Sequence, residues 1–413
     1  MARNKVFKNT FMLYLMSFAK LILPLLTMPY LTRVLSEDGY GLMSYVRSYM
    51  TYMQLFIDFG FILSSVKDIV KAGDDKKKIG TISGNTILAK SMLAVVAAVV
   101  MLVICLSVEL LRENWLFVML NFIGVATSIL LLDFLFRGIE KMQYITLIFF
   151  ITKTITTALT FALVRSDDQL LWIPILEILA NVISAVISIV IIKRLGIRFS
   201  VTSVRDCLYM IKDSFSYFLS NMATTAFSAL KTLIIGIYIT DLAQVAHWSL
   251  CLSMITAIQG LYAPICNGVY PHMIKEKSLK FIHKTMLLIM PLITLGCIFS
   301  FIIAKQALYL VGDETYMVAA PVFRCMIPIL FFSFPAQLYG WPTLGAIGKV
   351  KETTISTVVS AVVQVVGLVV LTAIGRFNLI TLALLRSFTE FCLMAIRMGI
   401  VYANRKSFLS LTQ

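Results

Sequence analysis

Charged residues are scarce in this sequence, and acidic residues are the scarcest of them. The 413 residues include 21 Asp and Glu against 36 Lys and Arg, and charged residues make up 14% of the chain. A soluble domain carries about 25%. Hydrophobic residues make up 59% of the chain, and the mean hydropathy is +0.90. This composition indicates an integral membrane protein.

Patterns of catalysis and metal binding are also missing. The chain has three histidines and seven cysteines without a CxxC pair, so no metal-ligand spacing and no disulfide framework is indicated. It has no P-loop, and no polar segment exceeds about 20 residues, which leaves no room for a soluble catalytic domain. We therefore expect neither an enzyme nor a bound cofactor.

Long apolar runs are what the sequence has in abundance. A helix needs about 20 apolar residues to cross the roughly 30 Å hydrocarbon layer, and helices satisfy their own backbone groups in lipid. No alternating pattern of a barrel occurs, so the predicted fold is an all-α membrane protein with about twelve spans. They lie near 11–35, 40–66, 82–107, 115–136, 142–163, 170–192, 214–239, 243–268, 285–304, 317–339, 353–374 and 378–402.

Basic residues between these runs predict the orientation. With the N-terminus inside, the inside segments hold 23 of the 36 Lys and Arg, whereas the outside segments hold four. The positive-inside rule then places both termini in the cytoplasm. Because this bias accounts for most of the net charge of +15, nucleic-acid binding is excluded.

Two halves of six spans are indicated by similar polar patterns. A shift of about 204 residues places the polar stripe of the first span on that of the seventh, and Ser44, Ser48, Thr51 and Gln54 of the second fall on identical residues of the eighth. We therefore predict two lobes around a central cavity, residues 1–200 and 201–413, joined by the basic cytoplasmic loop 193–213. Chance similarity remains the alternative.

Polar residues within the spans recur at helical spacing, which puts them on one face of each helix. A charge at the centre of the bilayer costs at least about 2.5 to 3.5 kcal/mol, so these stripes predict a shared interior cavity. Five cations without an acidic helical neighbour are predicted to bind substrate there: Lys20, Arg47, Lys153, Lys231 and Arg324. Polar partners in the cavity are predicted at Gln54, Asn221, Thr224 and Gln259.

Structural roles explain other intramembrane charges. Lys90 and Arg33 lie near the ends of their spans, where snorkelling to the interface is expected. Arg386 and Glu390 are spaced for an intrahelical ion pair, as are Asp133 and Arg137. Surplus cations in a cavity within the membrane favour an anionic substrate that has a lipid-soluble part.

The sequence also resembles a known family over most of its length. The stretches that carry the resemblance are LSEDGYGLMSYVRSYMTYMQLFIDFGF (35–61), LFRGIEKMQYITL (135–147), NGVYPHM (267–273), LYLVGDETYMVAAPVFR (308–324) and GAIGKVKETT (345–354). They are similar to the polysaccharide flippases, the Wzx-type O-antigen and capsule repeat-unit transporters of the multidrug/oligosaccharidyl-lipid/polysaccharide superfamily.

This resemblance implies a flippase of the bacterial inner membrane that works by alternating access between two six-helix lobes. Its substrate would be an undecaprenyl-pyrophosphate-linked oligosaccharide, and its partners would be membrane lipids and could include a polysaccharide polymerase and a chain-length regulator. Two positions depart from the family pattern. Arg137 replaces a frequent glutamine, and Leu230 stands where an acidic residue often precedes the lysine of the seventh span.

The charges fit this reading. The five cations can compensate a pyrophosphate, and the amides and hydroxyls can bind sugars. The membrane potential drives anions outward with about 2.3 kcal/mol per charge per 100 mV. Coupling to H⁺ or Na⁺ through Asp58, Glu177 or Glu390 stays open.

Two other functions stay open. A multidrug exporter would share the architecture, but cationic drugs favour acidic cavities. A membrane polymerase should have a large outer loop, which this chain lacks.

Overall fold

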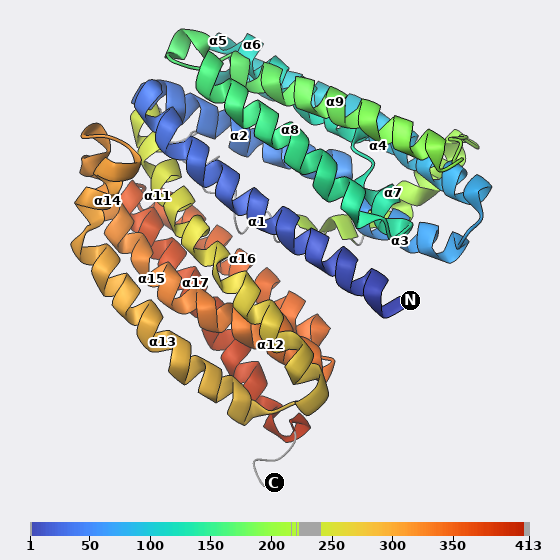
Figure 1. Ribbon diagram of the computed structural model, residues 1–413. Helices are drawn as coiled ribbons and strands as arrows, with labels where there is room; N and C mark the ends of the chain where they lie inside the picture. Colours follow the sequence, from blue (N-terminus) through green and yellow to red (C-terminus); the bar gives the residue numbers. More distant parts are fainter. Residues whose placement is uncertain (1, 216, 220, 223–240, 409–413) are drawn as a thin grey trace. The chain divides into compact units, whose positions relative to one another are not determined.

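The computed structural model describes residues 2–215, 217–219, 221–222 and 241–408. Contacts divide the chain into two compact units, Met1–Thr225 and Ala226–Gln413, and the described residues are helical with no strand (Figure 1). The predicted all-α fold is confirmed. The predicted lobe boundary at residue 200 stays a prediction.

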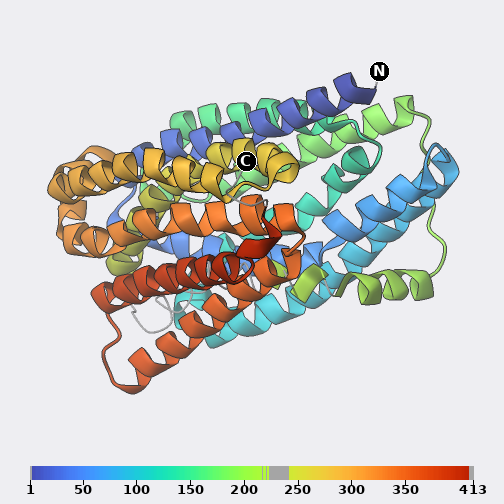
Figure 2. The same cartoon turned by 90° about the horizontal axis from the view of Figure 1, so that it is seen from below.

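The N-terminal unit is built from long helices that run side by side, coloured blue to green (Figures 1 and 2). Contacts join α1 to α8, α8 to α9, α6 to α9, and α2 to α4 and α6. Its elements are α1 (Ala2–Val34), α2 (Glu37–Asp58), α3 (Phe61–Ala72), α4 (Lys76–Ser107), α5 (Glu109–Glu113), α6 (Trp115–Thr127), η1 (Ser128–Leu130), α7 (Asp133–Gly138), α8 (Met142–Leu163), η2 (Asp167–Gln169) and α9 (Trp172–Arg194).

The C-terminal unit is centred on α15, which contacts α11, α13 and α17. Its elements are α11 (Leu242–Gly260), α12 (Tyr262–Glu276), α13 (Leu279–Ile302), α14 (Ala304–Val311), η3 (Thr315–Ala319), α15 (Ala320–Leu338), the π-helical turn η4 (Tyr339–Leu344), η5 (Gly345–Ile347), α16 (Val350–Ala373), α17 (Leu379–Ala403) and η6 (Arg405–Ser407).

Large apolar side chains lie on the outside of these helices. Leu287, Leu288 and Leu292 of α13 are 66–80% exposed, which is tolerable only where lipid replaces water as the solvent. Nine helical segments of the described chain are long and apolar enough to cross a membrane. The chain is therefore a multi-pass membrane protein.

Nine of the twelve predicted spans match these nine segments. The other three predicted spans are 11–35, 40–66 and 214–239. The run 11–35 lies within the single helix α1. The run 40–66 was wrongly predicted as one helix, because Phe59 and Gly60 adopt left-handed φ angles of 41° and 80° and separate α2 from α3. The run 214–239 lies mostly outside the described residues.

Helix ends are fixed by local hydrogen bonds. Ser36 caps α2 by accepting from the backbone N–H of Gly39, and Asp75 caps α4 by accepting from the N–H groups of Lys77 and Lys78. Such caps satisfy amide groups that the first turn of a helix leaves without partners.

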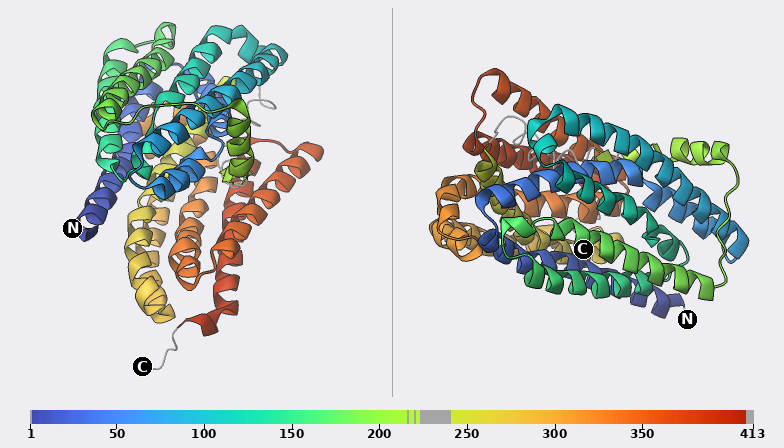
Figure 3. Two further views of the ribbon diagram at one scale, coloured as in Figure 1. Left: turned by 90° about the vertical axis from the view of Figure 1, so that its right-hand side faces the viewer. Right: turned by 90° about the horizontal axis from the view of Figure 1, so that it is seen from above.

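An extended segment, residues 197–203, leaves the end of α9 and crosses α4 (Figure 3). We call it the strap. It approaches closely because Gly80 and Gly84 have no side chain, and a Cβ at either position would fall on a carbonyl oxygen of the strap. The amide of Asn85 donates to Thr202 Oγ1 at 2.9 Å and accepts from its backbone N–H at 3.0 Å.

The helix that follows the strap packs on the same unit. Ser214 lies 2.6 Å from Ser64 of α3, and the ring of Phe218 stacks on Phe59 at 4.4 Å between centroids. Cys207 is fully buried. Much of the predicted linker 193–213 is therefore fixed to the N-terminal unit.

Candidate functional site

Asp58 is held between two helices by an ion pair and an amide. Lys90 of α4 donates to Asp58 Oδ1 at 2.7 Å, and Gln54, one turn earlier on α2, donates to Oδ2 at 2.7 Å. The Gln54 carbonyl in turn accepts from Ser128 at 2.9 Å. The side chain of Lys90 is 8% exposed and that of Asp58 is 40% exposed. The prediction that Lys90 snorkels was wrong, because its charge is paired inside the unit.

A second ion pair joins α8 and α9. Lys153 donates to Glu177 Oε1 at 3.2 Å, and both side chains are partly accessible. Arg47 of α2 is exposed and acts electrostatically on the same carboxylate. Lys153 therefore has an acidic partner that helical spacing within α8 could not reveal.

Lys20 lies on α1 with its ammonium 5.3 Å from the centroid of the Phe149 ring, a cation–π contact. The charged groups that act on it are Asp133, Arg137 and Lys153. Lys20 itself is exposed and has no ion pair within the described residues. It is thus a free cation next to a group of compensated charges.

These groups form one electrostatically connected set, which we call the N-terminal polar cluster. Its carboxylates and basic groups are linked through the contacts above and through Asp133, which interacts with cations of α1, α4 and α7. With every group ionised, five cations face three carboxylates, which leaves a surplus of two positive charges. The members are Lys20, Arg47, Gln54, Asp58, Lys90, Ser128, Asp133, Arg137, Lys153 and Glu177.

Helix breaks help to place this cluster. α2 ends at Asp58, and the η1 turn interrupts the helical run between α6 and α7, so Ser128 and Asp133 lie at helix ends. Sequence reasoning missed the pairing of Lys90 with Asp58 and the link from Asp133 to Lys20 and Lys90, because these partners come from other helices. The expected ion pair between Asp133 and Arg137 does not form within the described residues, although the two charges act on each other, and Arg137 Nε is a buried donor without a hydrogen-bond partner there.

In the C-terminal unit the three arginines within the long helices α15 and α17 make structural contacts. Arg386 and Glu390 form the predicted intrahelical pair at 2.6 Å, which is confirmed and buried. Arg324 donates to the carbonyl of Phe301 at 3.1 Å, at the C-terminal end of α13. A cation is favourable at that end of a helix.

Arg397 of α17 makes three hydrogen bonds through its guanidinium group. It donates to Ala336 O at 2.7 Å, to Ser356 Oγ at 3.0 Å and to Thr357 Oγ1 at 2.9 Å. The bond to Ala336 O lies at the end of α15, one turn before the helix breaks at Gly340, where ψ is −118°. Sequence reasoning gave Arg397 no such role.

The remaining predicted residues lie in several places. Gln259 is half-buried on α11, and Asn221 is half-buried in a helical stretch of the N-terminal unit. Thr224 and Lys231 lie outside the described residues. Whether the cations of the two units line one cavity stays a prediction.

Comparisons with known proteins agree with this architecture. Residues 6–277 match the model of a family described as "Polysaccharide biosynthesis protein". A protein of Escherichia coli (strain K12) named "Putative O-antigen transporter" is 26% identical over 340 residues, which cover 81% of this chain and 82% of that protein. One of the same name from Shigella dysenteriae is 25% identical and covers 67% and 69%.

Solved structures share the fold at low sequence identity. An inward-closed structure of the lipid II flippase MurJ has a TM-score of 0.69 at 13% identity and covers 94% of this chain and 86% of its own. An inward-facing multidrug resistance transporter of the MATE family, in the MOP superfamily, has a TM-score of 0.66 at 13% identity and covers 94% and 99%. These likenesses support the fold of two helical lobes.

Proposed function

We propose that this chain, which belongs to the polysaccharide biosynthesis protein family, moves lipid-linked oligosaccharides from the cytoplasmic to the outer leaflet of a bacterial inner membrane. The observation that carries the proposal is the surplus of two positive charges in the N-terminal polar cluster. An undecaprenyl-pyrophosphate group carries charge of the opposite sign and similar size. The names of the two relatives favour O-antigen repeat units as the substrate, and capsule repeat units are the alternative.

Lys20 and Arg47 are the groups we assign to the phosphates. Both are exposed, Lys20 on α1 and Arg47 on α2, and have no ion pair within the described residues. Lys153, Lys231 and Arg324 stay secondary candidates. Amide groups such as Gln54, Asn221 and Gln259 offer donors and acceptors to sugars, while the polyprenyl chain remains in lipid.

The driving force we propose is the membrane potential. Two negative charges leaving a negative interior gain about 4 to 5 kcal/mol at 100 mV. Each of the three carboxylates considered for ion coupling, Asp58, Glu177 and Glu390, is already paired with a basic side chain. A coupling H⁺ or Na⁺ would have to displace that partner, so direct coupling to the potential is favoured.

The proposed setting follows from the same assignment. Both termini lie in the cytoplasm, and the product reaches a polysaccharide polymerase and chain-length regulator on the outer side. No cofactor is required for this transport.

The experiment compares Lys20→Gln and Lys20→Arg in cells that lack the native gene. We expect the glutamine variant to insert normally and to lose most surface polysaccharide, with lipid-linked repeat units accumulating inside, whereas arginine should retain part of the activity because the charge remains. Lys67→Gln, an exposed lysine of α3 outside the cluster, is the matched control. Normal export by a well-expressed Lys20→Gln protein would contradict the assignment.

A further inference from the structure

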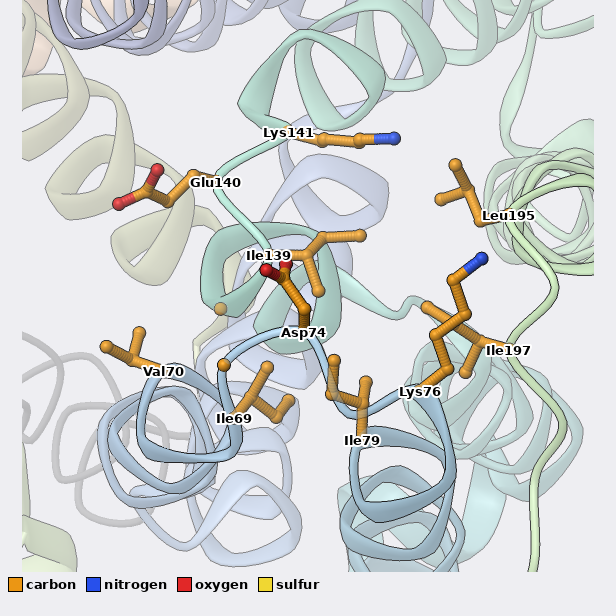
Figure 4. Close-up of a pocket in the computed structure, with 12 residues that line it drawn as sticks. Ile69, Val70, Asp74, Lys76, Ile79, Ile139, Glu140, Lys141, Leu195 and Ile197 are labelled. Atoms are coloured by element: carbon orange, nitrogen blue, oxygen red, sulfur yellow. The ribbon is translucent and has the colours of Figure 1, made fainter. Parts of the chain in front are cut away.

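Three turns of the N-terminal unit enclose a cavity of about 420 Å³ (Figure 4). The turns are those between α3 and α4, between α7 and α8, and after α9. All three belong to segments that the positive-inside rule places in the cytoplasm. The cavity therefore opens where membrane helices end, at the expected depth of lipid headgroups.

The floor of the cavity is aliphatic and its walls are fixed. Ile69, Ile79 and Ile197 line it and are buried. Glu140 has a left-handed φ of 56°, a conformation that costs a non-glycine residue about 1 to 2 kcal/mol. The turn is held nevertheless, because the N–H of Lys141 donates to Phe136 O at 2.8 Å. The cavity is thus a formed feature of the fold.

Charges of both signs line the rim, and they are separated. In Figure 4 the ammonium groups of Lys76 and Lys141 lie on the side of Leu195. The carboxylate of Asp74 lies in the middle of the view beside Ile139, and that of Glu140 points away from both lysines. Lys76, Lys141 and Asp74 make no side-chain hydrogen bond or ion pair within the described residues. Their charges are therefore available to a ligand.

We propose that this cavity binds the headgroup of a phosphatidylethanolamine-type phospholipid from the cytoplasmic leaflet. The phosphate would pair with Lys76 and Lys141, and the primary ammonium would donate to Asp74, with the glycerol part over the aliphatic floor. This site is separate from the N-terminal polar cluster and does not depend on the proposed transport function.

The lining distinguishes this headgroup from two others. A choline headgroup has no N–H to donate, and quaternary ammonium groups are recognised by aromatic cages. None of the residues that line this cavity is aromatic. A purely anionic headgroup such as phosphatidylglycerol would pair with the lysines but would be repelled by Asp74 and Glu140.

The test is lipid retention by the purified full chain, measured by native mass spectrometry after exchange into vesicles of phosphatidylethanolamine, phosphatidylcholine and phosphatidylglycerol in equal amounts. We expect phosphatidylethanolamine to be retained at least fivefold over the other two. The double variant Lys76→Gln/Lys141→Gln should lose that preference. Lys77→Gln is the matched control, because Lys77 belongs to the same helical turn but does not line the cavity.

Asp74→Asn separates zwitterion binding from simple anion binding. It should lower retention of phosphatidylethanolamine if the carboxylate holds the ammonium, with Asp68→Asn as the control outside the cavity. Stronger retention of phosphatidylglycerol by Asp74→Asn, with no loss of phosphatidylethanolamine, would overturn the proposal.

Two further arms complete the test. Free inorganic phosphate and free phosphoethanolamine are added as competitors, and displacement of the lipid by phosphate alone would assign the site to a soluble anion and overturn the lipid assignment.

If the lysine variant is poorly folded, Val70→Trp takes its place. Val70 lines the cavity and is 56% exposed, so the larger side chain can fill the mouth without entering the core. Unchanged lipid selectivity in a well-folded Val70→Trp protein would also count against the site.

Discussion

Breaking the Asp58–Lys90 ion pair should destabilise the N-terminal unit by an amount that depends on which partner is removed. Lys90 is 8% exposed, whereas Asp58 is 40% exposed and keeps the hydrogen bond from Gln54. Removing one partner of a buried pair costs about 3 to 5 kcal/mol. Lys90→Met leaves a carboxylate that is partly solvated, so we expect about 3 kcal/mol. Asp58→Asn leaves a buried ammonium, so we expect about 5 kcal/mol.

The assay is thermal unfolding of the purified protein in detergent, which is monitored by the loss of its monodisperse peak. For a unit of this size 1 kcal/mol corresponds to about 2 to 4 °C, so Lys90→Met should lower the midpoint by about 6 to 12 °C and Asp58→Asn by about 10 to 20 °C. The double variant should lie near the wild-type protein, because no buried charge is left unpaired.

The control is the exposed ion pair of Arg112 and Glu109. Arg112 Nη2 lies 3.8 Å from Glu109 Oε1, and the two side chains are 57% and 78% exposed. Arg112→Met should change the midpoint by no more than the roughly 1 kcal/mol of a surface pair. Equal effects of Lys90→Met and Asp58→Asn, or a double variant as unstable as the sum of the two, would refute the reasoning.

Four other predictions concern the membrane orientation, the strap, the cap of α4 and Arg397. Reporter fusions near Lys77, Arg205 and Lys280 should read cytoplasmic and those near Asp167 and Asp313 external; the reverse pattern would overturn the orientation. Gly84→Val should displace the strap and make the chain susceptible to trypsin cleavage at Arg198. Gly399→Val, at a position with open space around it, should leave Arg198 protected. A protected Arg198 in a folded Gly84→Val protein would show that the strap does not need the glycine. Backbone N–H groups of Lys78 and Lys77 lower the pKa of the exposed Asp75 carboxyl. The contribution of this cap to the stability of α4 is therefore fully present above the ordinary pKa of about 3.9 and is lost as the pH falls through the lowered pKa. Hydrogen exchange at the start of α4 should accelerate in acid for the wild-type protein but not for Asp75→Ser, which keeps a cap without a titrating group, and equal acid sensitivity of the two would exclude Asp75. Arg397→Gln should lower the unfolding midpoint. Gly340→Ala, whose Cβ would clash with the guanidinium of Arg397, should lower the midpoint little further when it is combined with Arg397→Gln. Full additivity of the two changes in midpoint would mean that the two residues act independently.

The sequence is sufficient for features that depend on local spacing or on composition. Apolar runs predict the spans, and the four-residue spacing of Arg386 and Glu390 predicts their ion pair. Lys90 and Lys153 could not be assigned in this way, because Asp58 and Glu177 lie 32 and 24 residues away in sequence and meet them only through helix packing. The break at Phe59 was missed for a related reason. Its left-handed backbone is stabilised by Phe218, which comes from the far end of the unit.

Helix packing also explains why polar stripes overestimated the number of free cations. A stripe shows which face of a helix is polar, but it does not show whether the next helix presents a carboxylate. In α8 the stripe contains Lys153, and its partner Glu177 belongs to a stripe on α9 that the sequence assigns to the same interior. Of the cations predicted to be free, Lys20 and Arg47 are those without an ion pair in the described part of the N-terminal unit.

The strap has a consequence for how the protein is made. The groove at Gly80, Gly84 and Asn85 is synthesised more than 100 residues before the segment that fills it. Until Thr202 emerges from the ribosome, the amide of Asn85 has no partner from the strap, although the helices before it can already be inserted. Because domains generally fold as units during synthesis, we expect the N-terminal half to wait, incompletely assembled, for the first residues beyond its last helix. A ribosome stalled before residue 197 should therefore hold a half-protein of the Thr81→Cys variant whose thiol is open to a maleimide reagent, and one stalled well after residue 222 should hold a protected thiol, because Thr81 lies beside Ser200 of the strap.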